Sequence, residues 1–283
     1  MIPAWRISPT KMEALRRYDF FDEDDYRHLG DEEMQKRIIG IVEPTEAMKI
    51  GSAIHKALET SSTWQESGNW VIRFEKRDDL GDLAAHGRPL REHPLSLTVG
   101  AFRFAGVIDV WLPRLVIDYK TSTRAADSTQ LASSWQWRCY CLMAKVKRFV
   151  FRHYQYSKAR VNAKGSVAIT CKPPSDLDLY LDVDQKWLQD QAERLVDVAV
   201  SLNCSGALRQ DRYPIIKNLI ECNKHSLVKT GKPLPSGLLQ CLWRNDLDRD
   251  ELQVETERVR GAMRPIGTFA PATVAFDQLE ALL

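Results

Sequence analysis

The sequence predicts an α/β fold in which a central mixed β-sheet is flanked by helices. Three observations support this prediction: a stretch with apolar residues at helical spacing, two adjacent β-rich segments joined by a two-residue connection, and a second helical stretch followed by a further β-rich segment. Such alternation is typical of a layered α/β architecture. With 283 residues, 44% of them hydrophobic, the chain is sufficient for one large domain with a core.

The first elements are helical and then extended. Residues 1–40 are charged and helix-prone, and from Ala47 to Thr60 apolar residues recur at helical spacing, so we expect a helix there that buries one face. Residues 69–75 are rich in β-formers and predict a strand. Residues 76–96 contain two glycines and two prolines among many charges, which predicts a long loop.

A β-hairpin is expected next. The segments 101–112 and 115–121 are rich in β-formers and only two residues separate them, a connection short enough to predict antiparallel pairing. With a two-residue turn, Asp109 lies opposite Asp118 and both side chains leave the same side of the sheet.

The following segments predict two helices and two strands. We expect a helix over 128–145 with Ser128 as its cap, strands over 147–157 and 165–171, and an amphipathic helix over 184–202.

The domain organisation follows from where these patterns end. We expect a single domain over residues 1–245, with a helical C-terminal part over 184–245. Beyond it the periodic pattern weakens, so residues 246–283 are expected to form a C-terminal extension.

The overall charge excludes few functions. The formal net charge is +2, so a chain that binds a polyanion would have to gather its basic residues on one face. One local cluster is a candidate for such a face, and a solvated helix-to-strand surface is the alternative. The cluster consists of Lys145, Lys147, Arg148, Arg152, His153, Lys158, Arg160 and Lys164.

Membrane and secreted classes are not indicated. No apolar run reaches the roughly 18 residues of a membrane span, and the N-terminus lacks the apolar run of a signal peptide. We therefore expect no membrane partner and a cytoplasmic location, where the six cysteines stay as thiols. No CxxC pair or zinc-ribbon spacing occurs, so most of the cysteines are expected in the core.

Four short motifs contain the residue types that catalysis uses. The first lies on the helix near Ala47, where Gly51, His55 and Glu59 are four residues apart and share one side at the edge of the buried face. A glycine there would let another chain or a substrate approach closely. An ordinary polar pair on a solvated helix is the alternative.

The second and third motifs lie on the two hairpin strands. Asp109 follows two β-branched residues on a strand expected to be partly buried, and a buried carboxylate needs a partner or a metal. Asp118 and Lys120 are two residues apart, so both leave the same face of their strand. Two opposed carboxylates repel each other and are best tolerated around a cation. A turn aspartate and a plain salt bridge are the alternatives.

The fourth motif is Gln136 and Tyr140, four residues apart on the next helix. By itself this spacing is equally typical of two polar residues on a solvated face.

The four motifs in this order resemble the RecB-family branch of the PD-(D/E)XK nuclease superfamily. The order is Gly-xxx-His-xxx-Glu, Gly-x-x-Asp, Asp-x-Lys and Gln-xxx-Tyr, over residues 46–157. The resemblance implies a PD-(D/E)XK restriction-endonuclease-like core and a metal-dependent deoxyribonuclease that hydrolyses phosphodiester bonds.

The resemblance also implies a role for each motif residue. His55, Asp109 and Asp118, with the backbone carbonyl of Tyr119, look like the ligands of Mg²⁺ or Mn²⁺. Lys120 looks like the residue that activates the attacking water, or a fixed cation beside the phosphorus centre. Glu59 looks like a further member of the catalytic group, and the residues that support the site or contact DNA are Gln136, Tyr140 and Arg138.

Some members of the family add an iron–sulfur cluster, bound by one cysteine upstream of the histidine motif and three near the C-terminus. Here Cys204, Cys222 and Cys241 occupy a similar C-terminal region, but no cysteine precedes Cys139. Because four thiolates are the usual requirement, we expect no iron–sulfur cluster.

No helicase motif or Gly-rich phosphate loop occurs, so the chain resembles the stand-alone, phage-type exonucleases of the family. This implies action on linear DNA, at duplex ends or on single strands, in recombination or repair, with a single-strand annealing or recombination protein as a partner. A structure- or sequence-specific endonuclease and a non-catalytic DNA-binding protein on a nuclease fold are the alternatives. A glycosidase built on the two aspartates would leave Lys120 and His55 unexplained.

Overall fold

The computed structural model describes residues 4–19, 28–40, 42, 44–59, 64–67, 70–76, 87–161 and 166–210. Within these residues, nine strands form one mixed sheet in the order β1-β5-β6-β7-β8-β3-β2, with β4 also paired to β5 and β9 also paired to β7. The strands are β1 (Trp5–Ile7), β2 (Trp64–Ser67), β3 (Trp70–Phe74), β4 (Leu90–Val99), β5 (Phe102–Leu112), β6 (Leu115–Ser122), β7 (Arg148–Val161), β8 (Val167–Cys171) and β9 (Ser175–Tyr180).

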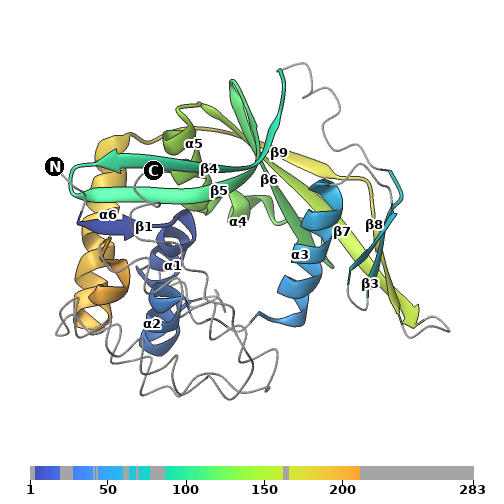
Figure 1. The fold of residues 1–283 in the computed structure, drawn as a ribbon, viewed down its shortest axis with the longest axis horizontal. Coiled ribbons are helices and arrows are strands. Elements are labelled where there is room, and N and C mark those ends of the chain that lie inside the picture. The colour runs from blue at the N-terminus through green and yellow to red at the C-terminus, as the bar shows by residue number, and fades with distance from the viewer. Residues whose placement is uncertain are drawn as a thin grey trace, which may run out of the picture.

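Helices cover the sheet on both sides, which confirms the predicted α/β arrangement (Figure 1). In Figure 1, α1, α2 and α6 group beside β1 and β5, whereas α3 lies by itself beside β6 and β7. The helices are α1 (Pro9–Asp19), α2 (Asp31–Ile39), α3 (Glu46–Glu59), α4 (Ser128–Ser133), α5 (Gln136–Ala144) and α6 (Gln185–Ser201), followed by a 3₁₀ turn (Ser205–Leu208).

The predicted hairpin between β5 and β6 is confirmed with its register. Leu112 pairs with Leu115, and Val110 pairs with Ile117. On its other side, β6 runs parallel to β7, and the crossover between them contains α4 and α5. The first half of β6 is therefore enclosed by neighbours on both edges and is buried from Leu115 to Tyr119.

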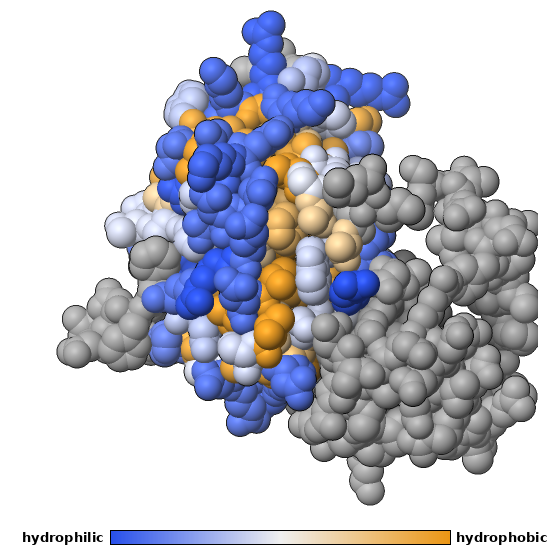
Figure 2. Space-filling view, turned by 90° about the vertical axis from the view of Figure 1, so that its left-hand side faces the viewer, coloured by the Kyte–Doolittle hydropathy of each residue, from blue (hydrophilic) through white to orange (hydrophobic). Residues whose placement is uncertain are grey.

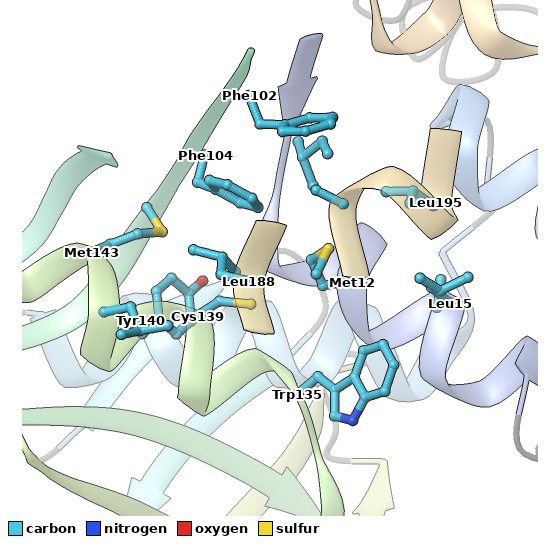
Figure 3. Packing of buried hydrophobic residues seen from close by; sticks show 14 of the residues in the cluster. Met12, Leu15, Phe102, Phe104, Trp135, Cys139, Tyr140, Met143, Leu188 and Leu195 are labelled. Carbon is cyan, nitrogen blue, oxygen red and sulfur yellow. The ribbon is translucent and has the colours of Figure 1, made fainter. Parts of the chain in front are cut away.

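The buried residues form two separate hydrophobic cores. The first core lies between the sheet and the helices α1, α2, α5 and α6, and Figure 3 shows Met12, Phe104, Tyr140 and Leu188 converging there from four different elements. The second core lies under α3, whose buried face carries the apolar residues expected from their spacing. On the face shown in Figure 2, hydrophilic residues predominate among the coloured ones, and hydrophobic residues gather along a central band with smaller patches above it.

The strand β5 serves both cores. Ile108 packs in the first core, and Val110, only two residues later, packs in the second. Because residues two apart on a regular strand share one face, β5 changes its orientation between them, at Asp109.

The helix predicted over 128–145 is in fact two helices. Glu13 of α1 accounts for the break: its Oε2 accepts hydrogen bonds from Ser134 Oγ (2.9 Å) and from the backbone N–H of Trp135 (2.8 Å). The predicted cap Ser128 is also wrong by one residue, because the side chain of Asp127 accepts the capping bond from the Gln130 N–H.

The loop predicted over 76–96 is wrong in its last part, because Leu90–Val99 forms β4. Its side chains alternate between exposed and half-buried, and it pairs with β5 along one edge. Pro94 is tolerated in a strand of this kind, since its missing N–H need not break a central ladder. The strand β9 was not predicted, although its sequence SDLDLY alternates with the period of a strand.

The C-terminal predictions lie mostly outside the described residues. The structure describes α6 and the 3₁₀ turn, whereas residues 211–245, the extension 246–283, Cys222 and Cys241 are not described. The cysteines at 139, 141, 171 and 204 are buried thiols, as predicted. No helix in the described part is long and apolar enough to span a membrane.

Candidate active site

The candidate site lies where α3 meets the ends of β5 and β6. Its centre is the carboxylate of Asp109, whose Oδ2 accepts a hydrogen bond of 2.6 Å from the backbone N–H of Tyr119. The backbone pairing of β5 and β6 stops one step earlier, at Val110 and Ile117. The carboxylate of Asp109 thus replaces the backbone carbonyl that would accept this N–H in a regular strand pair. This bond fixes Asp109 next to Tyr119, the residue that follows Asp118.

His55 of α3 faces the same carboxylate. Its Nδ1 lies 3.6 Å from Asp109 Oδ1, and its ring packs edge-on against that of Tyr119 at 6.0 Å. Burial lowers the pKa of His55, but the adjacent carboxylate of Asp109 outweighs burial, so the net direction is upward. The predicted meeting of the helix motif and the first hairpin aspartate is therefore present in the structure.

Gly51 explains how α3 reaches this position. A Cβ atom on Gly51 would lie 2.9 Å from Thr121 Oγ1, a closer approach than van der Waals contact permits. The glycine lets α3 pack directly on the end of β6. The close approach that the sequence predicts at Gly51 is therefore made by a strand of the same chain.

Asp118 and Lys120 form the second half of the site. Lys120 Nζ lies 2.6 Å from Asp118 Oδ2 and donates a hydrogen bond of 3.1 Å to Gln136 Oε1. Asp118 is only 6% exposed. Its Oδ2 has no hydrogen-bond partner in the part of the chain that the structure describes. The contact of this oxygen with Lys120 is therefore an ion pair without hydrogen-bond geometry. Burial raises the pKa of Asp118, Lys120 opposes that rise, and the charge of Asp109 adds to it.

The other predicted site residues differ in how they relate to this centre. Gln136 contacts Lys120 directly. The Tyr140 hydroxyl donates to the carbonyl of Val107 at 3.0 Å, so it supports β5 two residues before Asp109. Glu59 is exposed at the end of α3.

Arg138 is not brought to this centre. Its guanidinium forms a two-bond ion pair with Asp182, both at 2.8 Å, and also donates to the carbonyls of Ala132 and Ser134. It stacks on Trp137 at 4.4 Å. In this structure Arg138 therefore joins α5 to its neighbours.

Three described members of the predicted basic cluster are paired with acidic side chains, whereas the side chains of Arg160 and Lys164 lie outside the described part of the chain. Arg152 pairs with Asp176 and Arg148 with Asp178, both at 2.7 Å, because β9 lies alongside β7. Lys158 pairs with Glu46 at 3.0 Å. Much of the positive charge that the sequence places on β7 is thus neutralised within the sheet.

Two residues near the site were not predicted. Arg91 of β4 donates to the Tyr119 hydroxyl at 3.2 Å and to the Leu58 carbonyl at 3.4 Å, joining the edge strand to α3 and β6. Its neighbour Glu92 lies next to Asp109 across the β4–β5 pair. Both residues lie in the charge-rich segment 76–96, which the sequence predicts as a loop. They approach the site because β4 pairs with β5, and no local sequence motif indicates that pairing.

The residue types fit a divalent cation, although their side chains are not preassembled around one. Among the described residues, no three His, Cys, Asp or Glu side chains already form a set of metal ligands. The fit comes from Asp118: its buried Oδ2 has an ion pair with Lys120 but no hydrogen-bond partner among the described residues, and it lies near a second carboxylate, a position that a cation stabilises. Two carboxylates and one imidazole suit Mg²⁺ or Mn²⁺.

The sequence matches no known protein family and no curated protein. Several solved structures are similar to this chain in their fold, and three of them follow. The crystal structure of SSO0001 has 12% identity and a TM-score of 0.39, over 70% of this chain and 78% of that one. An alkaline exonuclease (LHK-Exo) from Laribacter hongkongensis has 9% identity and a TM-score of 0.37, over 79% and 94%. The same exonuclease in complex with dAMP has 9% identity and a TM-score of 0.35, over 79% and 93%.

Proposed function

We propose that this chain is a divalent-metal-dependent nuclease that hydrolyses phosphodiester bonds in DNA. The observation that supports the proposal is the meeting of four motif residues from a helix and a hairpin. His55 contacts Asp109, and Lys120 contacts Asp118, while the Tyr119 N–H joins the two pairs through its bond to Asp109. A salt bridge or a helix cap would account for one of these contacts, but not for the whole set in one place.

The ligands of the cation would be His55, Asp109 and Asp118, together with the backbone carbonyl of Tyr119. The N–H and C=O groups of one strand residue point to the same side. The Tyr119 carbonyl therefore leaves β6 on the Asp109 side, as its N–H does. When bound, Mg²⁺ or Mn²⁺ supplies the acidification of water and the neutralisation of phosphate oxygens that phosphodiester hydrolysis requires.

Lys120 has the environment of a fixed cation. The carboxylate of Asp118 attracts its ammonium group at 2.6 Å, and the amide oxygen of Gln136 accepts a hydrogen bond of 3.1 Å from it. About a third of its side chain is exposed, at 31%, so a phosphate oxygen can reach it. We assign Lys120 to stabilising the charge that develops on the phosphate, with Gln136 positioning it.

Within this proposal, the preferred substrate is linear DNA, degraded from an end in recombination or repair, and a single-strand annealing or recombination protein is the expected partner. An endonuclease that cuts within a chain would use the same residues.

The test is digestion of end-labelled linear DNA and of covalently closed circular DNA, each with Mg²⁺ or Mn²⁺ and with a chelator as control. We expect loss of the linear DNA, intact circles, and no cleavage with the chelator. Cleavage of the circles would replace the exonuclease assignment with an endonuclease. Binding of DNA without cleavage under every condition would contradict the proposed activity.

A further inference from the structure

Glu92 lies directly across from Asp109 in the pairing of β4 with β5. Arg91 pairs with Val110 and His93 pairs with Ile108, so the residues between these pairs, Glu92 and Asp109, face each other. Between Leu90 and Val99 of β4, the pairing with β5 is interrupted at one position, that of Glu92 and Asp109. The edge strand therefore brings a carboxylate to the centre of the candidate site.

The backbone at Glu92 has a conformation that is rare for its residue type. Its φ angle is 46°, in the left-handed region, which a residue with a Cβ atom adopts only at an energetic cost. On the opposite strand, β5 changes its orientation at Asp109, since Ile108 and Val110 pack in different cores. Both strands thus depart from regular geometry at the same place, where two acidic residues meet.

The electrostatic surroundings of Glu92 are those of the site. Partial burial raises the pKa of its carboxyl group, the charges of Asp109 and Glu59 raise it further, and His55 acts in the opposite direction. Among the described basic side chains, none forms an ion pair with Glu92. The carboxylates of Glu92, Asp109 and Glu59 thus act on one another, and the described groups that can balance them are His55 at Asp109 and Lys120 at Asp118.

We propose that Glu92 supplies a third carboxylate to the divalent cation that Asp109 and Asp118 bind, from the side of the site closed by β4. The inference rests on the proposed function, because it concerns the same cation. Besides the facing of Glu92 and Asp109, it is supported by Asp118 Oδ2, a buried oxygen of the same site that has no hydrogen-bond partner in the described part of the chain. A cation between the strands would relieve the repulsion and satisfy that oxygen.

The experiment is a titration of the full-length protein with Mn²⁺ in the absence of DNA, in which electron paramagnetic resonance measures the free ion. Glu92→Gln keeps the shape of the side chain and removes its charge. Glu193→Gln is the matched control, because Glu193 lies exposed on α6 and bonds to Gln189. Asp118→Asn removes the charge of a proposed ligand and so tests whether Mn²⁺ binds at this site at all.

We expect Glu92→Gln to weaken Mn²⁺ binding about 10-fold and Glu193→Gln to bind like the wild type. If Asp118→Asn weakens binding while Glu92→Gln matches the control, the role of Glu92 is wrong and the proposed function stands. If the wild type binds no Mn²⁺, the proposed function fails, and the inference fails with it.

Discussion

The carboxylate of Asp109 accepts a 2.6 Å hydrogen bond from the backbone N–H of Tyr119, at the step where the backbone pairing of β5 with β6 has stopped. This contact holds the two halves of the site together, since His55 faces Asp109 on one side and Asp118 precedes Tyr119 on the other. The positions of the proposed ligands are thus set by the point at which the pairing of β5 with β6 ends.

Replacing Asp118 with Asn should abolish cleavage and stabilise the fold at neutral pH. Burial raises the pKa of Asp118 above its ordinary value of 3.8, so the folded protein loses stability as the pH rises through the raised pKa. The Asn variant does not have this loss, so we expect it to be more stable than the wild type at neutral pH. Urea denaturation at pH 4 and pH 7.5 measures the difference, and a variant less stable than the wild type at both would contradict it.

Replacing Lys120 with Met should separate binding from catalysis. Methionine keeps the length of the side chain but removes the charge beside Asp118. We expect DNA cleavage to fall by about 100-fold or more, while Mn²⁺ binding stays at least as tight, because the competing ammonium group is gone. Single-turnover cleavage and a Mn²⁺ titration measure the two effects. Cleavage at the wild-type rate would remove Lys120 from the mechanism.

Binding of Mn²⁺ should weaken as the pH falls through the pKa of His55. Protonated imidazole cannot bind a metal ion, and the carboxylate of Asp109, 3.6 Å from the imidazole, outweighs burial to place this pKa above the ordinary 6.5. The loss of affinity should therefore have its midpoint above pH 6.5 in the wild type. In His55→Asn that midpoint should disappear. The same pH profile in both proteins would show that His55 is not a ligand.

Replacing Gly51 with Ala should destabilise the protein although alanine favours helices. The new Cβ atom would lie 2.9 Å from Thr121 Oγ1. Overpacking of this kind costs about 1–3 kcal/mol, against the roughly 1 kcal/mol that alanine gains in a helix.

A double-mutant cycle with Thr121→Ala tests this explanation. Removal of Oγ1 frees the space, so Gly51→Ala should become neutral or stabilising in that background. Equal effects of Gly51→Ala in both backgrounds would show that the close approach to Thr121 is not what the glycine provides.

The sequence was sufficient to predict the elements that carry the motifs. The spacing of apolar residues located α3, and the two-residue connection fixed the register of the hairpin as far as Val110 and Ile117, one step before Asp109 and Asp118. Local patterns suffice in these cases because the helix buries one face and the hairpin allows few alternative pairings.

The sequence was insufficient wherever a distant residue determines the local structure. Glu13, more than a hundred residues away, interrupts the helix predicted over 128–145 by accepting the N–H of Trp135. The approach of Glu92 to Asp109 depends on β4 pairing with β5, and its charged, proline-containing sequence is equally typical of a loop. The basic cluster could not be evaluated either, because the aspartates that neutralise it lie on β9.

The most direct test of the metal site is the anomalous diffraction of Mn²⁺ in crystals of the protein soaked with that ion. We predict an anomalous peak within coordination distance of His55, Asp109 and Asp118 together, with Lys120 beside it. A peak that only one of these side chains contacts, or no peak between α3 and the β5–β6 hairpin, would contradict the claim that they bind one cation.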